Sequence, residues 1–323
     1  MKNILIFGIA GQDGSYLAEF LLKKGYKVFG AYRRTSQKSF GRLEELGIAD
    51  DIEKITVDLA DQASIQSVIK KTNPDEIYNL AAQSYVESSF EQPILTIDIS
   101  GVAVIRILDS IRQNAPDAKF YQASSSEMYG NKKGIKNENT PFIPRSAYGA
   151  AKVLGHNMTV NYREAYNIFA CCGILFNHES PLRGTEFVTR KISSEIAKIK
   201  FKKQEKLHLG NIYAKRDWGF AKDYVEAMWL MMQQKKPEDY VISTGSSHSV
   251  EEFLDLASEY AGLGDWQNFC VIDESLKRPT DIEESVGDST KARTKLNWKP
   301  KIEFKELVKM MVDYDLNLHS NQK

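Results

Sequence analysis

Short β-rich segments alternate with amphipathic helical segments through the first half of this 323-residue chain. The β-rich segments read NILIF, KVFGAY, EKITV, DEIYNL, AKFYQAS and IFACCGIL, and stretches of ordinary helix length separate them. Each helix in such a pattern carries the chain back to the edge where the previous strand began, so consecutive strands run parallel. The alternation therefore predicts an α/β fold built on a doubly wound parallel sheet.

A glycine-rich loop joins the first predicted strand to the first predicted helix. It reads GIAGQDG, with glycines at positions 8, 11 and 14, and the amphipathic stretch SYLAEFLLKKG follows it. Glycines let the backbone turn tightly and approach a pyrophosphate, which the positive N-terminal end of the helix then binds. Glycine also serves strand-to-helix turns for steric reasons alone. The position of this loop nevertheless favours a dinucleotide-binding Rossmann fold.

Two arginines follow the second strand, where an NAD-specific fold carries an acidic residue for the ribose 2′-hydroxyl. Arg33 and Arg34 can instead pair with a 2′-phosphate, so the sequence favours NADP over NAD. The competing interpretation is a pair of exposed loop arginines. Asp58 follows the third strand and is placed to contact the adenine side of the cofactor.

The strand–helix alternation weakens after Asn177. Strand candidates such as DYVIST then come singly, and the tail KPKIEFKELVKMMVDYDL predicts a strand followed by a helix. We therefore expect a smaller α/β substrate-binding region that is interleaved with the sheet region. Residues 1–176 and about 211–244 would form the NADP-binding Rossmann region, and residues 177–210 and 245–323 would bind the substrate.

Charge and cysteine usage exclude several classes of function. Lysine plus arginine (43) balance aspartate plus glutamate (43), so no overall field favours nucleic acid. Neither the three cysteines nor the five histidines show the spacing of a disulfide framework or a metal site, so we expect no metal. No apolar stretch approaches the roughly 20 residues of a membrane span. We expect a cytoplasmic protein with no nucleic-acid or membrane partner.

Tyr148 and Lys152 stand four residues apart in a stretch with helical periodicity. Residues at this spacing share one face of a helix, so the ammonium can lower the pKa of the phenol. A tyrosinate held in this way is a general base for a sugar hydroxyl. The spacing alone is common on ordinary helix surfaces. Behind a dinucleotide loop and a strand that ends in three serines, it becomes specific.

These features together resemble the extended short-chain dehydrogenase/reductase family, in which a serine or threonine after the fifth strand joins the tyrosine and the lysine. Ser125 matches that residue and would polarise the carbonyl group that forms. Glu127 would point to the same side as Ser125 in an extended strand and would face the substrate as a second acid/base. A dehydratase needs such a carboxylate, whereas an epimerase or reductase does not. The competing interpretation is a helix-start glutamate paired with a lysine.

Longer motifs narrow the resemblance to the GDP-mannose 4,6-dehydratase family. They read GQDGSYLAEFLL, NLAAQSYVESSFEQP, YQASSSEMYG, TVNYREAYNI, GILFNHESPLRGTEFVTRKI, RDWGFAKDYVEAMWLMMQQ and GDSTKARTKLNWKP, and they cover nearly the whole chain. The resemblance implies a lyase that uses NADP to oxidise GDP-mannose, remove water and reduce the product, in the synthesis of deoxysugars.

The resemblance also implies a role for each matching residue. The catalytic residues would be Ser125, Glu127, Tyr148 and Lys152. The cofactor-binding residues would be Gly8, Gly11, Gln12, Asp13, Gly14, Arg33, Arg34, Asp58, Leu59, Leu80, Ala81, Ala82, Gln83, Ser84, Tyr148, Lys152, His178 and Arg183. The substrate-binding residues would be Ser84, Ser125, Glu127, Asn177, Val188, Lys191, Gly210, Arg216, Arg278 and Glu283. Among these, the lysine and the arginines supply cations for a diphosphate.

The sequence departs from the family pattern at three places. Ser125 stands where threonine is usual, which preserves the hydroxyl. Leu95 stands where a tyrosine usually contacts the cofactor. The segment TSQKSFGRLEELGIADD, after Arg34, differs from the arginine-rich loop that reaches a neighbouring subunit's cofactor in relatives and helps to build a tetramer. We therefore expect a homo-oligomer that is a dimer or a tetramer.

Alternative functions stay open at this point. A GDP-manno-heptose 4,6-dehydratase would use the same catalytic set with a larger pocket near C6 of the sugar. A 4-keto reductase or epimerase would share the fold, but it has no elimination step for Glu127 to serve. A non-catalytic NADP-binding protein would have no physical reason to keep a carboxylate beside a tyrosinate.

Overall fold

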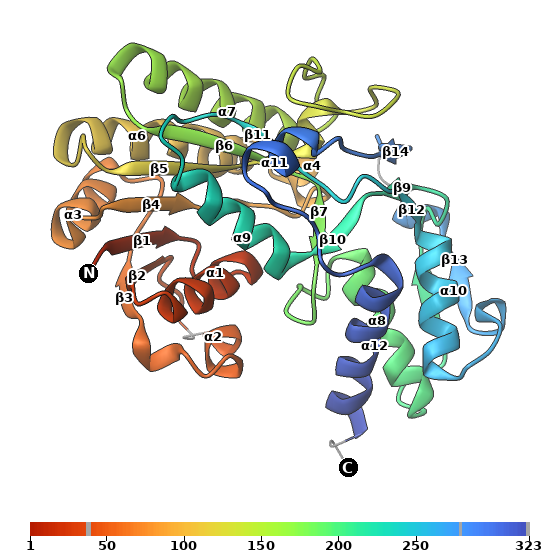
Figure 1. Ribbon diagram of the computed structural model, residues 1–323. Coiled ribbons are helices and arrows are strands. Elements are labelled where there is room, and N and C mark those ends of the chain that lie inside the picture. Colours follow the sequence, from red (N-terminus) through yellow and green to blue (C-terminus); the bar gives the residue numbers. More distant parts are fainter. Residues whose placement is uncertain (37–39, 278–279, 321–323) are drawn as a thin grey trace.

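A parallel sheet of seven strands forms the centre of the protein, in a computed structural model that describes residues 1–36, 40–277 and 280–320 (Figure 1). The strand order is β11-β6-β5-β4-β1-β2-β3. The strands are β1 (Asn3–Phe7), β2 (Lys27–Tyr32), β3 (Glu53–Thr56), β4 (Glu76–Asn79), β5 (Lys119–Ser125), β6 (Ala170–Leu175) and β11 (Tyr240–Ile242). All neighbouring strands in it run parallel, which confirms the predicted doubly wound fold.

Helices cover both faces of this sheet, so its central strands are apolar on both sides. In β1, Ile4 and Ile6 pack towards α1 (Gln12–Lys23) and α9 (Ala221–Met232). Leu5 and Phe7 face the opposite layer, built from α3 (Gln62–Thr72), α6 (Ala103–Asn114) and α7 (Ala147–Tyr166). Short helical segments α4 (Ser88–Glu91), α5 (Pro93–Ile97) and the π-helical turn Asp98–Val102 lead into α6.

Capping side chains fix where the key helices begin and end. The Asp61 carboxylate accepts a hydrogen bond from the Ala63 amide and starts α3, and Asn73 ends that helix with a left-handed φ of 40°. The hydroxyl of Ser146 accepts from the Gly149 amide at 3.0 Å and starts α7.

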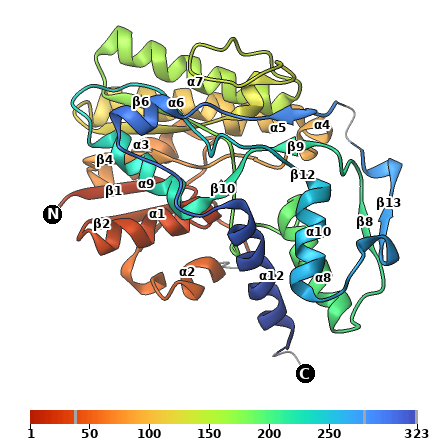
Figure 2. The ribbon, with the colours of Figure 1, turned by 45° about the vertical axis from the view of Figure 1, so that its right-hand side comes forward.

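A second apolar core lies beside the sheet, among α8 (Val188–Lys200), α10 (Val250–Ala261) and α12 (Phe304–Ser320) (Figure 2). β8 (Leu207–Leu209) and β13 (Cys270–Ile272) pair at its edge. β9 (Lys215–Arg216) lies between β12 (His248–Ser249) and β14 (Glu284–Ser285). β10 (Trp218–Phe220) pairs with β7 (Asn177–Glu179), which leaves the end of β6 and connects the two cores.

Two features of the C-terminal part differ from the sequence expectation. Residues 299–303 form no strand, because the backbone amides of Lys301 and Ile302 donate to the Asp223 carboxylate instead of a neighbouring strand. Leu296 and Trp298, which flank the end of α11 (Thr290–Lys295), pack in the core of the sheet region rather than in the substrate region. The division of the chain into two regions stays a prediction. Leu296 and Trp298, which it placed in the substrate region, pack with the sheet region instead.

The segment that follows Arg34 folds back onto its own subunit over its described part. α2 (Gly41–Glu45) and a 3₁₀ turn (Ala49–Asp51) place Phe40, Leu43 and Ile48 in the core beneath α1. Residues 37–39 lie outside the described residues. Leu95 is 43% exposed on α5 and does not line the cleft described below.

Candidate active site

The loop between β1 and α1 forms a cradle that requires glycine at two positions. Gly8 has a φ of +87°, and a Cβ there would lie 2.8 Å from the backbone nitrogen of Ala81. A Cβ at Gly14 would lie 2.3 Å from the carbonyl oxygen of Gly8. The start of α1 can therefore approach the loop closely and direct its free amides towards a ligand. This geometry fits the pyrophosphate of a dinucleotide.

A cleft of about 430 Å³ runs from this cradle along the carboxyl ends of the strands to the substrate region. Parallel α/β sheets bind ligands at this edge. The residues predicted for the site that line the cleft are Gly8, Gly11, Gln12, Asp13, Gly14, Leu80, Ala82, Ser84, Ser125, Glu127, Tyr148, Lys152, Asn177, His178, Arg183, Val188, Lys191, Gly210 and Arg216. The fold thus brings the proposed cofactor, catalytic and substrate residues into one space.

Ser125 and Glu127 lie at the end of β5, but they are not joined by extended backbone. The chain turns into a short 3₁₀ helix (Ser126–Tyr129), because the Ser125 hydroxyl accepts a hydrogen bond from the Glu127 amide at 3.2 Å. The predicted reason for their common orientation, an extended strand, is therefore wrong. Both residues nevertheless line the cleft.

Tyr148 and Lys152 lie in the first turns of α7, next to this short helix. Gly149 permits the contact, since a Cβ there would lie 2.8 Å from the Glu127 carbonyl oxygen. Lys152 donates a hydrogen bond to the Ala123 carbonyl at 2.7 Å, and its Nζ lies 5.6 Å from the centre of the Tyr148 ring. Both side chains are almost fully buried.

Burial controls the ionisation of this pair. It raises the pKa of Tyr148 to about 12, although a hydrogen bond with Ser125 opposes the rise. It also lowers the pKa of Lys152 to about 8. The sequence predicted that the lysine would lower the pKa of the tyrosine. In the protein by itself, loss of solvation raises this pKa, and the groups that oppose the rise are Ser125 and Arg183 rather than Lys152.

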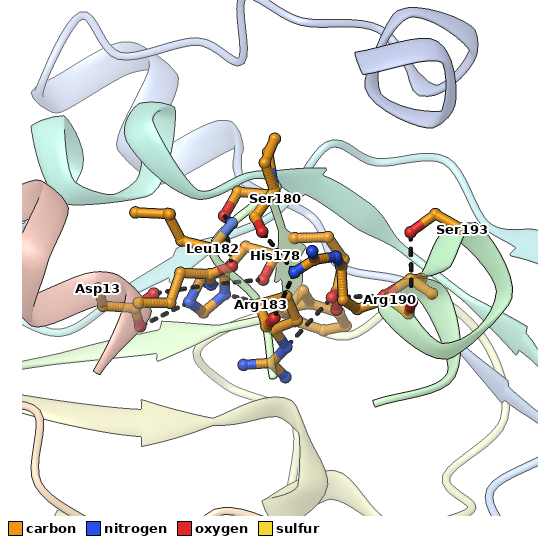
Figure 3. Close-up of polar contacts among 12 residues, drawn as sticks. Asp13, His178, Ser180, Leu182, Arg183, Arg190 and Ser193 are labelled. Carbon is orange, nitrogen blue, oxygen red and sulfur yellow. Dashed lines mark hydrogen bonds and ion pairs between the residues drawn. The ribbon is translucent and has the colours of Figure 1, made fainter. Parts of the chain in front are cut away.

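Asp13 and His178 form a half-buried ion pair beside the cradle (Figure 3). The His178 Nε2 atom lies 2.8 Å from the Asp13 carboxylate, and Nδ1 lies 2.7 Å from the Phe176 carbonyl oxygen. Since both partners are acceptors, the ring donates from both nitrogens and is an imidazolium. Burial disfavours both charges, but each partner stabilises the other, so the pKa of Asp13 falls to about 2 and that of His178 rises. The ring also stacks on Tyr224 at 4.6 Å.

Arg183 and Lys191 lie further along the cleft. The Arg183 Nε atom is 3.1 Å from the Glu179 carboxylate, and its guanidinium lies 3.5 Å from the centre of the Phe187 ring. The ammonium of Lys191 donates to the His208 carbonyl at 2.6 Å. These cations make this half of the cleft suitable for an anionic ligand.

Arg33, Arg34 and Asp58 lie outside the cleft, exposed at the ends of β2 and β3. The end of β2 adjoins the cradle, because the Gly8 amide donates to the Ala31 carbonyl at 3.2 Å. This position suits contact with the far end of a dinucleotide. The Asp58 carboxylate caps its own turn by accepting from the amide of residue 60 at 2.9 Å.

Leu59, Ala81 and Gln83 also lie outside the lining of the cleft. Leu59 is half-buried, and its carbonyl accepts a hydrogen bond from Arg106. The Ala81 backbone forms the wall against which the cradle packs. Gln83 donates from its side chain to the Tyr85 carbonyl, so it shapes the segment after β4.

Four acidic residues that line the cleft were not predicted from the sequence: Glu87, Glu179, Glu186 and Asp281. Asp281 lines the cleft and lies 3.0 Å from the guanidinium of Arg216, and it accepts a hydrogen bond from Asn211 at 3.1 Å. Glu283 is exposed and does not line the cleft. The sequence DIEE at residues 281–284 did indicate an acidic segment near the substrate. The family resemblance selected Glu283 in it, whereas the side chain that lines the cleft is that of Asp281, two residues earlier. Arg278 lies outside the described residues.

Other features of the described chain bear on the class of protein. Cys171, Cys172 and Cys270 are buried and unbridged. Among residues 1–36, 40–277 and 280–320, no group of histidine, cysteine and acidic side chains has the arrangement of a metal site. In the same residues, no helix has the length and apolar character needed to cross a membrane.

Solved structures share this fold across almost the whole chain. UDP-glucose 4-epimerase from Thermus thermophilus, in complex with NAD, superposes with a TM-score of 0.85 at 23% identity, over 97% of this chain and 98% of that one. dTDP-glucose 4,6-dehydratase from Bacillus anthracis, also in complex with NAD, superposes with a TM-score of 0.84 at 20% identity, over 100% and 98%. At these identities the likeness establishes the fold.

Sequence relatives are much closer. The family model described as GDP-mannose 4,6 dehydratase matches residues 5–311. GDP-mannose 4,6 dehydratase 1 of Arabidopsis thaliana is 51% identical over all of this chain and 92% of its own length. GDP-mannose 4,6 dehydratase of Homo sapiens is 49% identical over 98% of this chain and 92% of its own. The chain therefore belongs to the GDP-mannose 4,6-dehydratase family.

Proposed function

We propose that the protein is an NADP-dependent hydro-lyase that converts GDP-mannose to GDP-4-keto-6-deoxy-mannose. The observation that carries the proposal is the single cleft that joins the glycine cradle to Ser125, Glu127, Tyr148 and Lys152. An acid/base carboxylate beside a tyrosine–lysine pair serves an elimination reaction in addition to oxidation and reduction. The name shared by relatives at 49–51% identity supports the same substrate.

The cofactor would occupy the cradle and the sheet edge beside it. Gly8 and Gly14 provide the close backbone approach, and the N-terminal end of α1 provides favourable charge for the pyrophosphate. Arg33 and Arg34 would bind the 2′-phosphate, which makes the cofactor NADP rather than NAD. When bound, the nicotinamide supplies the reversible acceptance of hydride that an internal redox reaction needs.

Tyr148, Ser125 and Lys152 would act at C4 of the sugar. The Tyr148 phenolate takes the proton of the O4 hydroxyl, and the Ser125 hydroxyl donates a hydrogen bond to the oxygen that becomes the ketone. With a pKa of about 12 in the protein alone, Tyr148 needs nearby positive charge in the assembled complex. The Lys152 ammonium lies 5.6 Å from the ring centre and is one source of that charge.

Glu127 would carry out the elimination. A ketone at C4 acidifies the proton on C5, which the Glu127 carboxylate removes. The resulting carboxylic acid then protonates the hydroxyl group that leaves from C6 as water, so Glu127 returns to its carboxylate form and a C5=C6 double bond is left. Glu127 lies on the short helix after β5 and lines the cleft, so its carboxylate can reach a bound sugar to transfer these protons. Return of the hydride to C6, with the proton that Tyr148 took from O4 given to C5, would complete the 6-deoxy product and restore both the tyrosinate and the oxidised cofactor.

The cationic half of the cleft would bind the GDP group. Lys191 and Arg216 would contact the diphosphate, as would Arg278, which lies outside the described residues. We assign to Asp281 the substrate-binding place that the family resemblance implies for Glu283, because Asp281 lines the cleft and pairs with Arg216. Homo-oligomer formation and a cytoplasmic location stay predictions.

The test is mass spectrometry of the purified protein incubated with GDP-mannose and NADP⁺, with absorbance of the reduced cofactor followed in parallel. We expect a product lighter by one water and no net accumulation of NADPH. Accumulation of NADPH with no loss of water would replace the proposal with simple oxidation. Turnover of GDP-manno-heptose with GDP-mannose left unchanged would move the proposal to the seven-carbon sugar.

A further inference from the structure

A short turn at residues 180–183 lies between Asp13 of the glycine loop and Arg190 of α8 (Figure 3). It follows β7, whose His178 pairs with Asp13 at the cradle, and it ends at Arg183, which lines the cleft. The Ser180 hydroxyl donates to the side chain of Gln12 at 2.7 Å, and Gln12 donates to the His178 carbonyl at 3.1 Å. The first part of the turn is thereby attached to the glycine loop.

A buried ion pair holds the turn on the substrate side. Arg190, on α8, donates two hydrogen bonds to Asp315 of α12, at 2.6 and 2.9 Å, and Ser193 donates a third at 2.6 Å. The remaining nitrogen of Arg190 donates to the carbonyls of Pro181 and Arg183, at 2.6 and 3.2 Å. Because Asp315 is fully buried, this anchor fixes the turn to the helices of the substrate region.

Arg42 attaches the same turn to the cofactor side. It lies on α2, and its Nε atom donates to the Leu182 carbonyl at 2.7 Å. Its Nη1 atom donates to the Ala10 carbonyl at 3.0 Å, which belongs to the cradle. A guanidinium is planar and rigid, so one side chain fixes the separation of these two carbonyl groups. Arg42 therefore connects the glycine loop directly to a turn that the substrate helices also hold.

We propose that Arg42 is a positioning residue that couples occupation of the glycine cradle to the geometry of Arg183 and of the GDP-binding half. A pyrophosphate bound at the cradle would restrict the motion of residues 8–11. Because Arg42 hydrogen-bonds to both Ala10 and Leu182, it would also restrict the motion of Leu182 and, through the turn, of Arg183. Two ligands that order one shared element bind with positive cooperativity. The inference rests on the proposed function for the identity of the two ligands.

The experiment measures binding of GDP to the cofactor-free full chain, with and without saturating NADP⁺, by calorimetry. In the wild type we expect NADP⁺ to tighten GDP binding by about fivefold or more, as is usual for coupled sites. In Arg42→Met the factor should fall to about twofold or less. Arg42→Lys keeps the charge but loses the rigid fork, so it should resemble Arg42→Met rather than the wild type.

Arg163 provides the matched control. Its Nη1 atom donates to the Ala170 carbonyl at 3.0 Å, and the guanidinium makes two hydrogen bonds to Asp239. It does not line the cleft. Arg163→Met removes a comparable arginine fork elsewhere in the sheet region, so it should keep the wild-type coupling factor. Hydrogen exchange of the backbone at residues 180–187 gives a second readout, with NADP⁺ increasing protection in the wild type and not in Arg42→Met.

Each result has a distinct meaning. Unchanged coupling and unchanged exchange in Arg42→Met overturn the inference, as does a wild type that binds both nucleotides independently. Loss of coupling in Arg42→Met supports it, even in a protein that fails to dehydrate GDP-mannose, in which case the proposed function alone falls. A wild type that binds neither nucleotide overturns both.

Discussion

Replacing Lys152 by methionine should abolish catalysis and stabilise the cofactor-free fold at neutral pH. The lysine is almost fully buried, and burial lowers its pKa from 10.5 to about 8. At about 1.4 kcal/mol for each pH unit, the charged form therefore costs about 3 kcal/mol of folding free energy. Methionine has a similar shape and no charge. It forfeits the hydrogen bond to the Ala123 carbonyl, which offsets about 1 to 2 kcal/mol of the gain.

The sign of the pH dependence follows from the lowered pKa. Between pH 8 and 10.5 the unfolded chain holds more protons on Lys152 than the folded chain does, so the stability of the wild type rises with pH in this window. The advantage of Lys152→Met should be greatest below pH 8. It should shrink by about 2 to 3 kcal/mol between pH 7 and pH 10, because only the wild type carries this titration.

The assay is urea unfolding of both proteins at several pH values, after removal of bound nucleotide so that ligand does not contribute to stability. Lys136 gives a matched control, since it is buried, has a pKa lowered by burial, donates to a backbone carbonyl and does not line the cleft. Lys136→Met should show the same pH trend and retain turnover. A stability difference between wild type and Lys152→Met that stays constant with pH would refute the reasoning.

Three further predictions concern single steps or single contacts. Glu127→Gln should stop water loss and keep NADP⁺ binding; titration and product mass check this, and undiminished turnover would remove Glu127 from the mechanism. Arg33→Ala with Arg34→Ala should weaken NADP⁺ far more than NAD⁺, and equal weakening would mean that neither arginine contacts the 2′-phosphate. Asp13→Asn removes the partner of His178. Because the pKa of Asp13 is lowered to about 2, its stabilisation of about 2 kcal/mol is present above pH 4 and lost as pH falls towards 2. Acid unfolding curves of wild type and variant should therefore converge near pH 2, and curves that stay apart there would contradict the assignment.

The fold was predictable from local patterns because its central strands are buried on both faces. Such strands appear as continuous apolar runs, and each of the six runs read from the sequence became a strand of the sheet. The failure at residues 299–303 has the opposite cause. Their alternating pattern suits a strand, but the amides of Lys301 and Ile302 are taken by the carboxylate of Asp223, on a helix far away in sequence.

The residues proposed as catalytic could be selected from the sequence because each lies in a short segment whose local structure is fixed. A serine that ends a strand and a tyrosine four residues before a lysine carry their own geometry. Glu127 was found for a partly wrong reason, since the backbone turns into a 3₁₀ helix where extension was assumed. The pKa of Tyr148 was not accessible in this way, because it depends on how much solvent the rest of the fold removes.

Residues that hold the cleft in shape leave a much weaker mark on the sequence. Arg42 donates to a backbone carbonyl of the turn that is 140 positions away in the sequence, and Arg190 donates to two carbonyls of the same turn that are 7 and 9 positions away. A backbone carbonyl accepts these hydrogen bonds whatever side chain its residue carries. No spacing rule or pairing of charges therefore reveals them. Only the fold, by bringing the turn between the glycine loop and α8, shows that two arginines on different elements hold one segment. The substitution of Arg42 consequently tests a feature that only the three-dimensional structure shows.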